Sequence, residues 1–268
     1  MNCKIAVTGM LLFLISCKNS DSKAQVDQVS KVSIVGKDNN DENSNNGNPY
    51  FDIAAIPLPQ GFRRLDTTEN SFAQWLLQIH LKKDKTVYLY DGTTKANQSA
   101  QFAVLDIPVG SKDLQQCADA VMRLRASFFF DQKKYDSIVF YDNEGHAYRF
   151  LQPYTGEHFN KYLQTVFGMC GTASLSKQLK KIDLKEIRPG DVLIRGGFPG
   201  HAVIVMDVIV NEAGQKKFMI AQSYMPAQSI HILLNNAMQG VSPWYDVTGT
   251  DVIGTPEYTF YASELKRW

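Results

Sequence analysis

A cysteine and a histidine occupy positions in this chain that suit a thiol nucleophile and its base. Cys117 lies near the start of a segment with helical periodicity, where free backbone amides and the helix dipole favour a thiolate. His201 follows a glycine-rich turn at residues 195–200 and opens a strongly apolar strand. A histidine there can hold its ring at the mouth of a cleft while the strand behind it is anchored in the core. The two residues supply two of the three parts of a cysteine-nucleophile site.

Each residue also has an ordinary structural interpretation. Cys117 belongs to an apolar stripe at helical spacing with Val121 and Leu124, so it is equally suited to a buried core position. A single histidine at a strand edge most often faces solvent. Cys170 is a second candidate nucleophile, because small residues and a predicted helix follow it. In an oxidising compartment the alternative is a disulfide between Cys170 and Cys117.

Three short motifs surround these residues: Gln116-Cys117-Ala118-Asp119, Pro189-Gly190-Asp191-Val192 and Gly200-His201-Ala202-Val203-Ile204-Val205. Over residues 113–224 they resemble the CHAP and NlpC/P60 group of papain-like amidases and peptidases. In that group a cysteine at a helix N-terminus and a histidine opening a strand form the catalytic pair, and a polar residue on the next strand orients the imidazole. The chain departs from this pattern by a helical insertion at residues 158–179 and by the segment 56–108, which has no counterpart in a minimal member.

The resemblance implies a catalytic set of Cys117, His201 and Gln222, in which Gln222 orients the histidine. The residues that it implies for substrate binding or support are Gln116, Asp119 and Tyr224.

Strand pairing places Gln222 on the correct face but too far along the strand. A hairpin centred near residues 213–214 pairs Gln222 with about Val205, on the same face as His201. This pairing leaves Gln222 four residues from His201 along the strand, so a bulge or a shifted register is required. The alternative is that Gln222 is an ordinary polar strand residue.

The periodicity of the chain predicts an α+β fold of papain-like type, with N-terminal helices packed on an antiparallel sheet. A capping box formed by Asp113 and Gln116 is expected to start the helix that carries Cys117. Helices are expected at residues 71–81, 114–128, 158–167 and 174–179. Strands are expected at residues 87–90, 102–107, 138–141, 146–150, 192–194, 201–210, 218–224 and 230–234.

The N-terminus predicts export and lipid attachment. Residues 1–16 combine Lys4 with an apolar run that is too short to span a bilayer, and they end in a sequence that resembles a bacterial lipobox at Cys17. This resemblance implies cleavage before Cys17, lipid on its thiol and amino group, and a membrane-anchored protein of the cell envelope, periplasmic or on the cell surface. The alternative is an ordinary secretory signal with an incidental cysteine.

The remaining chain divides into a tether and one folded domain. Residues 17–48 are rich in Asn, Asp, Ser and Lys and are expected to be a disordered tether. Residues 49–268 are expected to form a single α+β domain, with an N-terminal extension at 49–110 and a papain-like core at 111–268. The whole chain also resembles a family of bacterial lipoproteins of unknown function, which implies no activity.

Charge and residue spacing exclude several classes of function. Removal of residues 1–16 leaves 27 basic and 27 acidic side chains, so there is no global basic field for nucleic acid. We expect no metal and no cofactor, because cysteine and histidine spacing does not suggest a zinc site and no dinucleotide fingerprint is visible. The histidines that remain unassigned are His80, His146, His158 and His231.

Two functions therefore compete. The first is an envelope-anchored cysteine hydrolase that cleaves an amide bond, with the stem peptides of peptidoglycan as the expected substrate. The second is a non-catalytic lipoprotein that uses the same fold to bind a glycan, a peptide or a protein partner. The aromatic residues that would suit such a binding face are Trp244, Tyr245, Tyr258 and Tyr261, and burial in the core is the alternative for them.

Overall fold

The computed structural model describes residues 47–237, 242–247, 249 and 251–268. The expected signal peptide at 1–16, the lipidation site Cys17 and the tether up to residue 46 lie outside the described residues. Asn48 is buried, and its backbone N–H donates to the carbonyl oxygen of Lys83 at 2.8 Å. Among the described residues, no helix is both long enough and apolar enough to cross a membrane.

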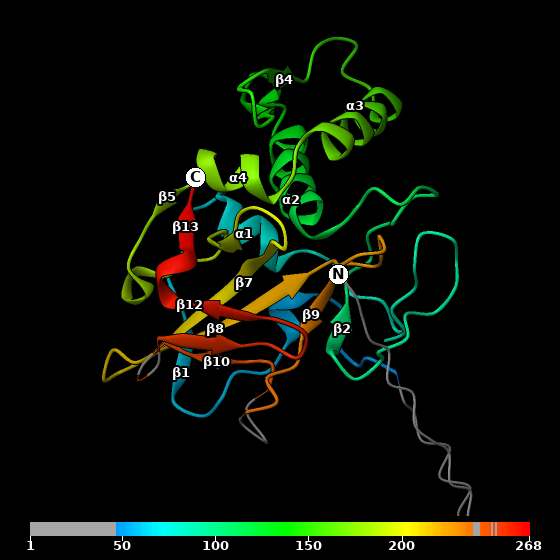
Figure 1. Ribbon diagram of the computed structural model, residues 1–268. Helices are drawn as coiled ribbons and strands as arrows, with labels where there is room; N and C mark the ends of the chain where they lie inside the picture. Colours follow the sequence, from blue (N-terminus) through cyan, green and yellow to red (C-terminus); the bar gives the residue numbers. More distant parts are fainter. Residues whose placement is uncertain (1–46, 238–241, 248, 250) are drawn as a thin grey trace, which may run out of the picture. The chain divides into compact units, whose positions relative to one another are not determined.

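One antiparallel sheet organises the described chain (Figure 1). Its main path runs β2-β9-β8-β7-β6-β13-β5, while β1 pairs with β7 and β10 pairs with β8. The two longest strands, β7 and β8, form a hairpin at its centre. The strands are β1 (Phe62–Arg64), β2 (Gln101–Val104), β5 (Lys180–Lys181), β6 (Val192–Arg195), β7 (His201–Asn211), β8 (Lys216–Gln222), β9 (His231–Leu233), β10 (Tyr245–Asp246) and β13 (Leu265–Arg267).

The α-helices gather on one side of this sheet (Figure 1). Helix α2 packs against β7 and also contacts α1, α3 and α4. The α-helices are α1 (Phe72–Leu77), α2 (Cys117–Asp131), α3 (Gly156–Met169) and α4 (Thr172–Gln178). The short 3₁₀ helices are η1 (Ile53–Ala55), η2 (Tyr135–Ser137), η3 (Leu184–Glu186) and η4 (Ala262–Glu264). The mixed α+β class that the periodicity predicts is therefore confirmed.

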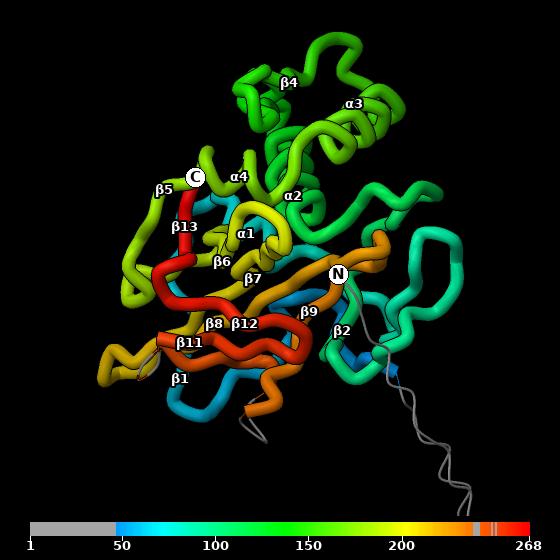
Figure 2. Tube along the Cα trace, in the orientation of Figure 1, coloured from blue at the N-terminus to red at the C-terminus, as the bar shows by residue number. Residues whose placement is uncertain are grey.

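Two small hairpins stand outside the large sheet. The first joins β3 (Val139–Tyr141) to β4 (Ala147–Arg149), as the sequence predicts. The second joins β11 (Val252–Gly254) to β12 (Thr259–Tyr261) and lies across the central strands (Figure 2). Buried side chains of β11 and β12 belong to one core cluster with residues of β7 and β8. This second hairpin therefore covers the sheet face opposite the helices.

Alternation along β7 divides the core between these two faces. Ala202 and Ile204 point into the cluster formed with the helices, whereas Val203 and Val205 point into the cluster formed with β11 and β12. Because side chains alternate along a strand, His201 shares the face of Val203. Its ring accordingly lies against Phe260 of β12, with ring centroids 5.8 Å apart.

The pairing of β7 with β8 departs from the simple hairpin in two places. At the turn, Val210 pairs with Lys216. A hairpin centred between residues 213 and 214 would instead pair Val210 with Lys217, so the register is shifted by one residue. A bulge between Val205 and Asp207 then adds a second step in the same direction, because Val205 pairs with Ile220. Both shifts move the end of β8 toward the start of β7. The register change that Gln222 needs to reach His201 is therefore present.

Two segments differ from the predicted elements. Helix α1 ends at Leu77, before the end of the predicted 71–81 helix. The residues that follow form isolated β-bridges with other segments, such as Leu81↔Leu105. Residues 87–90 do not form a strand, because the chain turns back on itself there: the N–H of Leu89 donates to the carbonyl oxygen of Thr93 at 2.8 Å. Tertiary pairing and a tight turn override local periodicity in both places.

The Pro189-Gly190-Asp191-Val192 motif has a structural role. Asp191 is 1% exposed and accepts two hydrogen bonds from Arg267 of β13, from Nε at 2.6 Å and from Nη2 at 2.8 Å. It also accepts the backbone N–H of Arg188 at 2.7 Å. The carboxylate thus ties the last strand to the turn that leads into β6.

We predict that Asp191→Asn lowers the free energy of unfolding by about 2 kcal/mol. Breaking a fully buried ion pair costs roughly 3–5 kcal/mol, and partial exposure of the Arg267 side chain (30%) reduces the effect. Urea denaturation followed by circular dichroism measures it. Asp66→Asn, which removes an exposed pair with Arg63, is the matched control and should change stability by less than about 0.5 kcal/mol. Equal effects of the two substitutions would contradict the structural role of Asp191.

Candidate functional site

A cavity of about 290 Å³ opens where the N-terminus of α2 meets the start of β7. Cys117 and His201 both line it, although the sequence separates them widely. Both are buried, with 8% and 2% of their surfaces exposed. The fold therefore brings the predicted nucleophile and base to one cleft. The other predicted site residues that line this cleft are Gln116, Asp119 and Tyr224, together with the rival cysteine Cys170.

Helix α2 begins at Cys117, one turn later than the predicted Asp113 capping box requires. Gln116 is the N-cap, and the Asp119 carboxylate accepts its backbone N–H at 2.9 Å. The capping box predicted for Asp113 and Gln116 is therefore wrong. Asp113 is engaged in a tertiary contact, in which its carboxylate accepts the backbone N–H of Ala227 at 2.6 Å. The amide of Cys117 thus lies in the first turn, where backbone N–H groups have no intrahelical acceptor.

The segment before α2 is fastened to the loop that follows β8. Ser223 is fully buried, and its hydroxyl lies 2.7 Å from the carbonyl oxygen of Gln115 and 2.9 Å from that of Gln228. Since Ser223 directly follows Gln222, these contacts and the Asp113–Ala227 contact hold Cys117 in a fixed position relative to the end of β8.

The glycine-rich turn positions His201 by close backbone approach. A Cβ atom on Gly200 would lie 2.5 Å from Thr172 Oγ1 and 2.8 Å from the carbonyl oxygen of Arg195, so the turn accepts only glycine there. The Thr172 hydroxyl also donates to the carbonyl oxygen of Gly197 at 3.2 Å. Helix α4 thereby holds the turn from which β7 and His201 emerge.

Aromatic rings enclose the imidazole. The ring centroid of His201 lies 4.6 Å from that of Tyr224 and 4.9 Å from that of Tyr258. With Phe260, these rings remove most of the imidazole from solvent and restrict its rotation.

Gln222 makes a direct contact with the histidine. His201 Nε2 lies 2.8 Å from Gln222 Oε1, and Gln222 is 1% exposed. An amide oxygen only accepts hydrogen bonds, so Nε2 is the protonated nitrogen of the neutral ring and Nδ1 keeps a lone pair. Gln222 thus has the contact that an orienting residue requires, as the resemblance implies.

Burial keeps both members of the pair neutral at pH 7. It lowers the pKa of His201 to about 4, against the opposing effects of Gln222 and Glu257. Burial, followed by the charge of Asp119, raises the pKa of the Cys117 thiol to about 11, although the backbone amides of Ala118 and Ala202 favour the thiolate. Desolvation therefore outweighs the helix dipole. The action of the Ala202 amide also indicates that the sulfur lies beside the first residues of β7.

Two further predicted residues, Asp119 and Cys170, are also buried. Asp119 is 5% exposed, and burial raises its pKa well above the usual range, which fits a capping residue better than a charged ligand for substrate. Cys170 and Cys117 are both free thiols. Burial raises the pKa of Cys170 to about 12, so this thiol is also neutral at pH 7.

The aromatic residues proposed for a binding face separate into two groups. Trp244 and Tyr245 are buried, and Trp244 Nε1 donates to the carbonyl oxygen of Pro57 at 3.1 Å. These two residues belong to the core, as the alternative interpretation expects, and do not form an exposed binding face. Tyr261 is 53% exposed, and Tyr258 lines the cleft.

Sequence reasoning missed a group of polar residues behind Gln222. Gln222 Nε2 donates to Glu257 Oε2 at 2.8 Å, and Lys95 Nζ contacts the same oxygen at 2.6 Å. Glu257 lies in the connection between β11 and β12, and Lys95 lies in the segment before β2. Neither residue has a motif around it, so only the tertiary structure reveals them.

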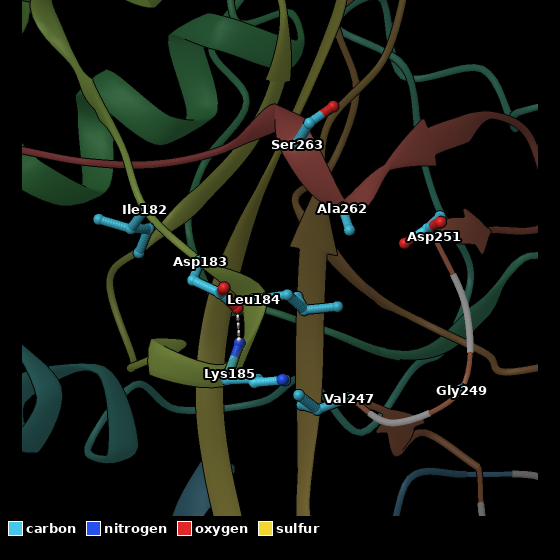
Figure 3. A pocket seen from close by; sticks show the side chains of 9 residues that line it. All are labelled: Ile182, Asp183, Leu184, Lys185, Val247, Gly249, Asp251, Ala262 and Ser263. Carbon is cyan, nitrogen blue, oxygen red and sulfur yellow. Dashed lines mark hydrogen bonds between the residues drawn. The ribbon is translucent and has the colours of Figure 1, made fainter.

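A second hollow, of about 610 Å³, lies beside η3 and η4 (Figure 3). Its acidic residues are Asp183 and Asp251, and Asp183 accepts the backbone N–H of Lys185 at 2.8 Å, which is a turn contact. No cysteine or histidine is among its described lining residues. In the part of the chain that the structure describes, no group of three or more His, Cys, Asp or Glu side chains could hold a metal ion. The cleft with Cys117 is thus the better candidate site.

We predict that His201 stays neutral across the physiological range and titrates near pH 4. The exposed His146 is the internal control: its hydrogen bond with Asp142 raises its pKa, so it should titrate above the ordinary value of about 6.5. Two-dimensional NMR of ¹⁵N-histidine-labelled protein measures both. Titration of His201 near pH 6.5 would show that its ring is solvated and would contradict the buried site.

Comparison with known proteins identifies a family but no activity. Residues 53–158 and 152–267 match the family model described as Domain of unknown function (4846). No curated protein and no solved structure matches the chain. The two matched segments together span well over half of the sequence, so the chain belongs to the family described as Domain of unknown function (4846).

Proposed function

We propose that this protein is a papain-like cysteine hydrolase, similar to the CHAP and NlpC/P60 enzymes, that cleaves an amide bond. Cys117 is the nucleophile, His201 is the base and then the acid, and Gln222 orients the imidazole. The observation that carries the proposal is the 2.8 Å contact between His201 Nε2 and Gln222 Oε1 at a cleft that Cys117 also lines. This contact leaves Nδ1 of His201 as the free lone pair.

The reaction begins when Cys117 Sγ attacks the carbonyl carbon of the substrate amide. The thiol proton passes to Nδ1 of His201 as the carbon–sulfur bond forms, and the carbonyl oxygen becomes an oxyanion. Backbone N–H groups in the first turn of α2 are suitable donors to this oxygen. The Gln116 side-chain amide is a further donor, since one of its N–H groups is not required by its 3.2 Å contact with Asp113.

Collapse of the tetrahedral intermediate breaks the carbon–nitrogen bond. The imidazolium of His201 gives its Nδ1 proton to the leaving amine, and the acyl group remains on Cys117 as a thioester. Water then attacks the thioester carbon while Nδ1 of His201 takes a proton from the water molecule. The carbon–sulfur bond breaks, the carboxylic acid leaves, and the Cys117 thiolate recovers the proton from the ring. Throughout the cycle the Gln222 oxygen accepts a hydrogen bond from Nε2–H of His201 and stabilises the transient imidazolium.

The neutral state of Cys117 and His201 before substrate binds determines when the thiol proton is transferred. With the pKa of Cys117 at about 11 and that of His201 at about 4, a preformed thiolate–imidazolium pair is disfavoured before substrate binds. Proton transfer therefore accompanies attack on the carbonyl carbon. Donors at the helix N-terminus stabilise the oxyanion only in the transition state, which is where stabilisation accelerates the reaction.

The expected location and the cleft rim together suggest a substrate class. Lipid on Cys17 would hold the domain in the cell envelope, where the stem peptides of peptidoglycan offer amide bonds. Phe198 is 96% exposed and Met225 is 52% exposed, and both line the cleft. The rim therefore favours a substrate with an apolar group beside the scissile amide.

One observation favours a second function, in which the cleft binds a peptide, glycan or protein without cleaving it. Cys117 is only 8% exposed, and its pKa lies above that of an ordinary thiol. A buried neutral thiol is also compatible with a binding cleft. Binding that survives removal of the thiol, without turnover in the intact protein, would favour this second function.

We predict that Cys117→Ala abolishes amide hydrolysis, with a loss of at least about 10³-fold, because no other group replaces the nucleophile. Digested peptidoglycan is incubated with each protein, and the released amines and peptides are identified by mass spectrometry. Cys170→Ala is the matched control, a second buried thiol at the same cleft, and should retain cleavage. Equal cleavage by wild-type and Cys117→Ala protein would reject the proposed nucleophile.

We also predict that Phe198→Ser raises KM about threefold to tenfold and leaves kcat nearly unchanged, because a rim contact binds the ground state and the transition state equally. The steady-state kinetics are measured on the muropeptide that the wild-type protein cleaves. Phe51→Ser is the matched control, since Phe51 is also exposed (68%) but does not line the cleft. A fall in kcat with unchanged KM would be inconsistent with a rim contact.

A further inference from the structure

A buried polar cluster lies directly behind Gln222, on the side away from His201. We call Lys95, Asn97, His231 and Glu257 the Glu257 cluster. Lys95 is 8% exposed and His231 is fully buried. Glu257 Oε2 contacts Lys95 Nζ at 2.6 Å, and Glu257 Oε1 accepts an N–H of Asn97 at 3.0 Å. These residues come from three separate segments, so their meeting point is a product of the tertiary fold.

The cluster determines which way the Gln222 amide faces. Burial works to raise the pKa of Glu257, but the hydrogen bonds and charges of its partners, Lys95 foremost, outweigh burial, and the pKa lies below the ordinary value. Glu257 is therefore an ionised carboxylate that only accepts hydrogen bonds. The group 2.8 Å from Glu257 Oε2 must then be the NH₂ of Gln222. The oxygen of the same amide is left to face His201.

His231 supports the same orientation. Its Nδ1 lies 2.9 Å from the carbonyl oxygen of Ser229, so Nδ1 carries the proton and Nε2 is an acceptor. Burial lowers the pKa of His231 to about 4, which keeps the ring neutral at pH 7. Its Nε2 lies 3.4 Å from Gln222 Nε2. Both neighbours of the NH₂ group are thus acceptors, and a flipped amide would face an oxygen of Glu257 with its own oxygen.

We propose that Glu257 is a positioning residue of the candidate catalytic site: by accepting the Gln222 N–H, it turns the Gln222 oxygen to His201 and keeps the lone pair of His201 on Nδ1. This inference rests on the proposed function for its catalytic meaning. Loss of the acceptor frees the Gln222 amide to rotate. A rotated amide presents NH₂ to His201 Nε2, which favours the Nδ1–H tautomer that cannot take the proton of Cys117.

Lys95 makes this arrangement tolerable in a buried site. A carboxylate beside Gln222 without a cation would be costly to bury, and Lys95 supplies the counter-charge at 2.6 Å. The pair also connects the β11–β12 hairpin to the segment before β2, so the cluster has a structural role as well. A test must therefore follow the His201 tautomer as well as activity or stability.

The test uses the full-length double variant Lys95→Met/Glu257→Leu. It removes the acceptor and the buried cation together, so no unpaired charge remains in the interior. The matched control is Lys217→Met/Asp246→Leu, which removes another largely buried ion pair, between β8 and β10, five residues along β8 from Gln222. Proteins labelled with ¹⁵N-histidine are compared by NMR at neutral pH, and the His201 signals are assigned by their absence in His201→Gln. Release of p-nitrophenol from p-nitrophenyl acetate gives the rate of acyl transfer.

We expect His201 to be the Nε2–H tautomer in the wild-type and control proteins. In Lys95→Met/Glu257→Leu we expect Nδ1–H to become populated and acyl transfer to fall about tenfold. An Nδ1–H tautomer in the wild-type protein would overturn the inference without any variant. An unchanged tautomer in a folded Lys95→Met/Glu257→Leu protein would also overturn it. A tautomer change without any wild-type acyl transfer would support the positioning role and reject the catalytic proposal, so the two failures are distinguishable.

Discussion

The hydrogen bond between His201 Nε2 and Gln222 Oε1 is the interaction on which the candidate site depends. It forms only because the β7–β8 hairpin is shifted at its turn and again at the bulge before Asp207. It also requires the turn at Gly200 to approach Thr172 and Arg195 more closely than any side chain allows. The placement of one imidazole ring thus requires a specific strand register and a specific turn.

Cys117 reaches the same place by a separate route. The segment before α2 is held by the buried hydroxyl of Ser223 and by the contact of Asp113 with the loop after β8. Because Ser223 directly follows Gln222, the end of β8 positions both the orienting amide and the start of the helix. Distortion of this strand end would therefore displace the thiol and the imidazole together. The cleft is preorganised from both sides, as the proposed chemistry requires.

Burial gives this site its electrostatic character. Desolvation keeps the thiol and the imidazole neutral. Lys95 and Glu257 form an ion pair that is separated from His201 by the Gln222 side chain. Glu257 therefore reaches His201 through the Gln222 amide, which contacts both residues. In the proposed site this arrangement favours the Nε2–H tautomer of His201, while the Lys95–Glu257 pair stays behind the Gln222 amide.

The periodicity of the sequence was sufficient to predict the α+β class, the β3–β4 hairpin and the strand that His201 opens. It placed the helix start at Asp113, but the carboxylate of Asp113 accepts a hydrogen bond from the backbone of Ala227. Capping rules consider only residues that are neighbours in the sequence, so they could not predict this contact. The motifs around Cys117 and His201 also predicted that they meet at one cleft. Glu257 and Lys95 were not predictable, because their roles arise from contacts between segments that are distant in sequence.

The most direct test of Cys117 as the nucleophile is the position of the acyl group after reaction with p-nitrophenyl acetate. Sγ of the nucleophile displaces p-nitrophenolate and forms an acetyl thioester, which peptide mass spectrometry at acidic pH locates. The proposed mechanism predicts one acetyl group on Cys117 in the wild-type protein, with little on Cys170 and strongly reduced labelling in His201→Ala. Equal labelling of Cys117 in His201→Ala, or labelling that favours Cys170, would rule out the proposed Cys117–His201 pair.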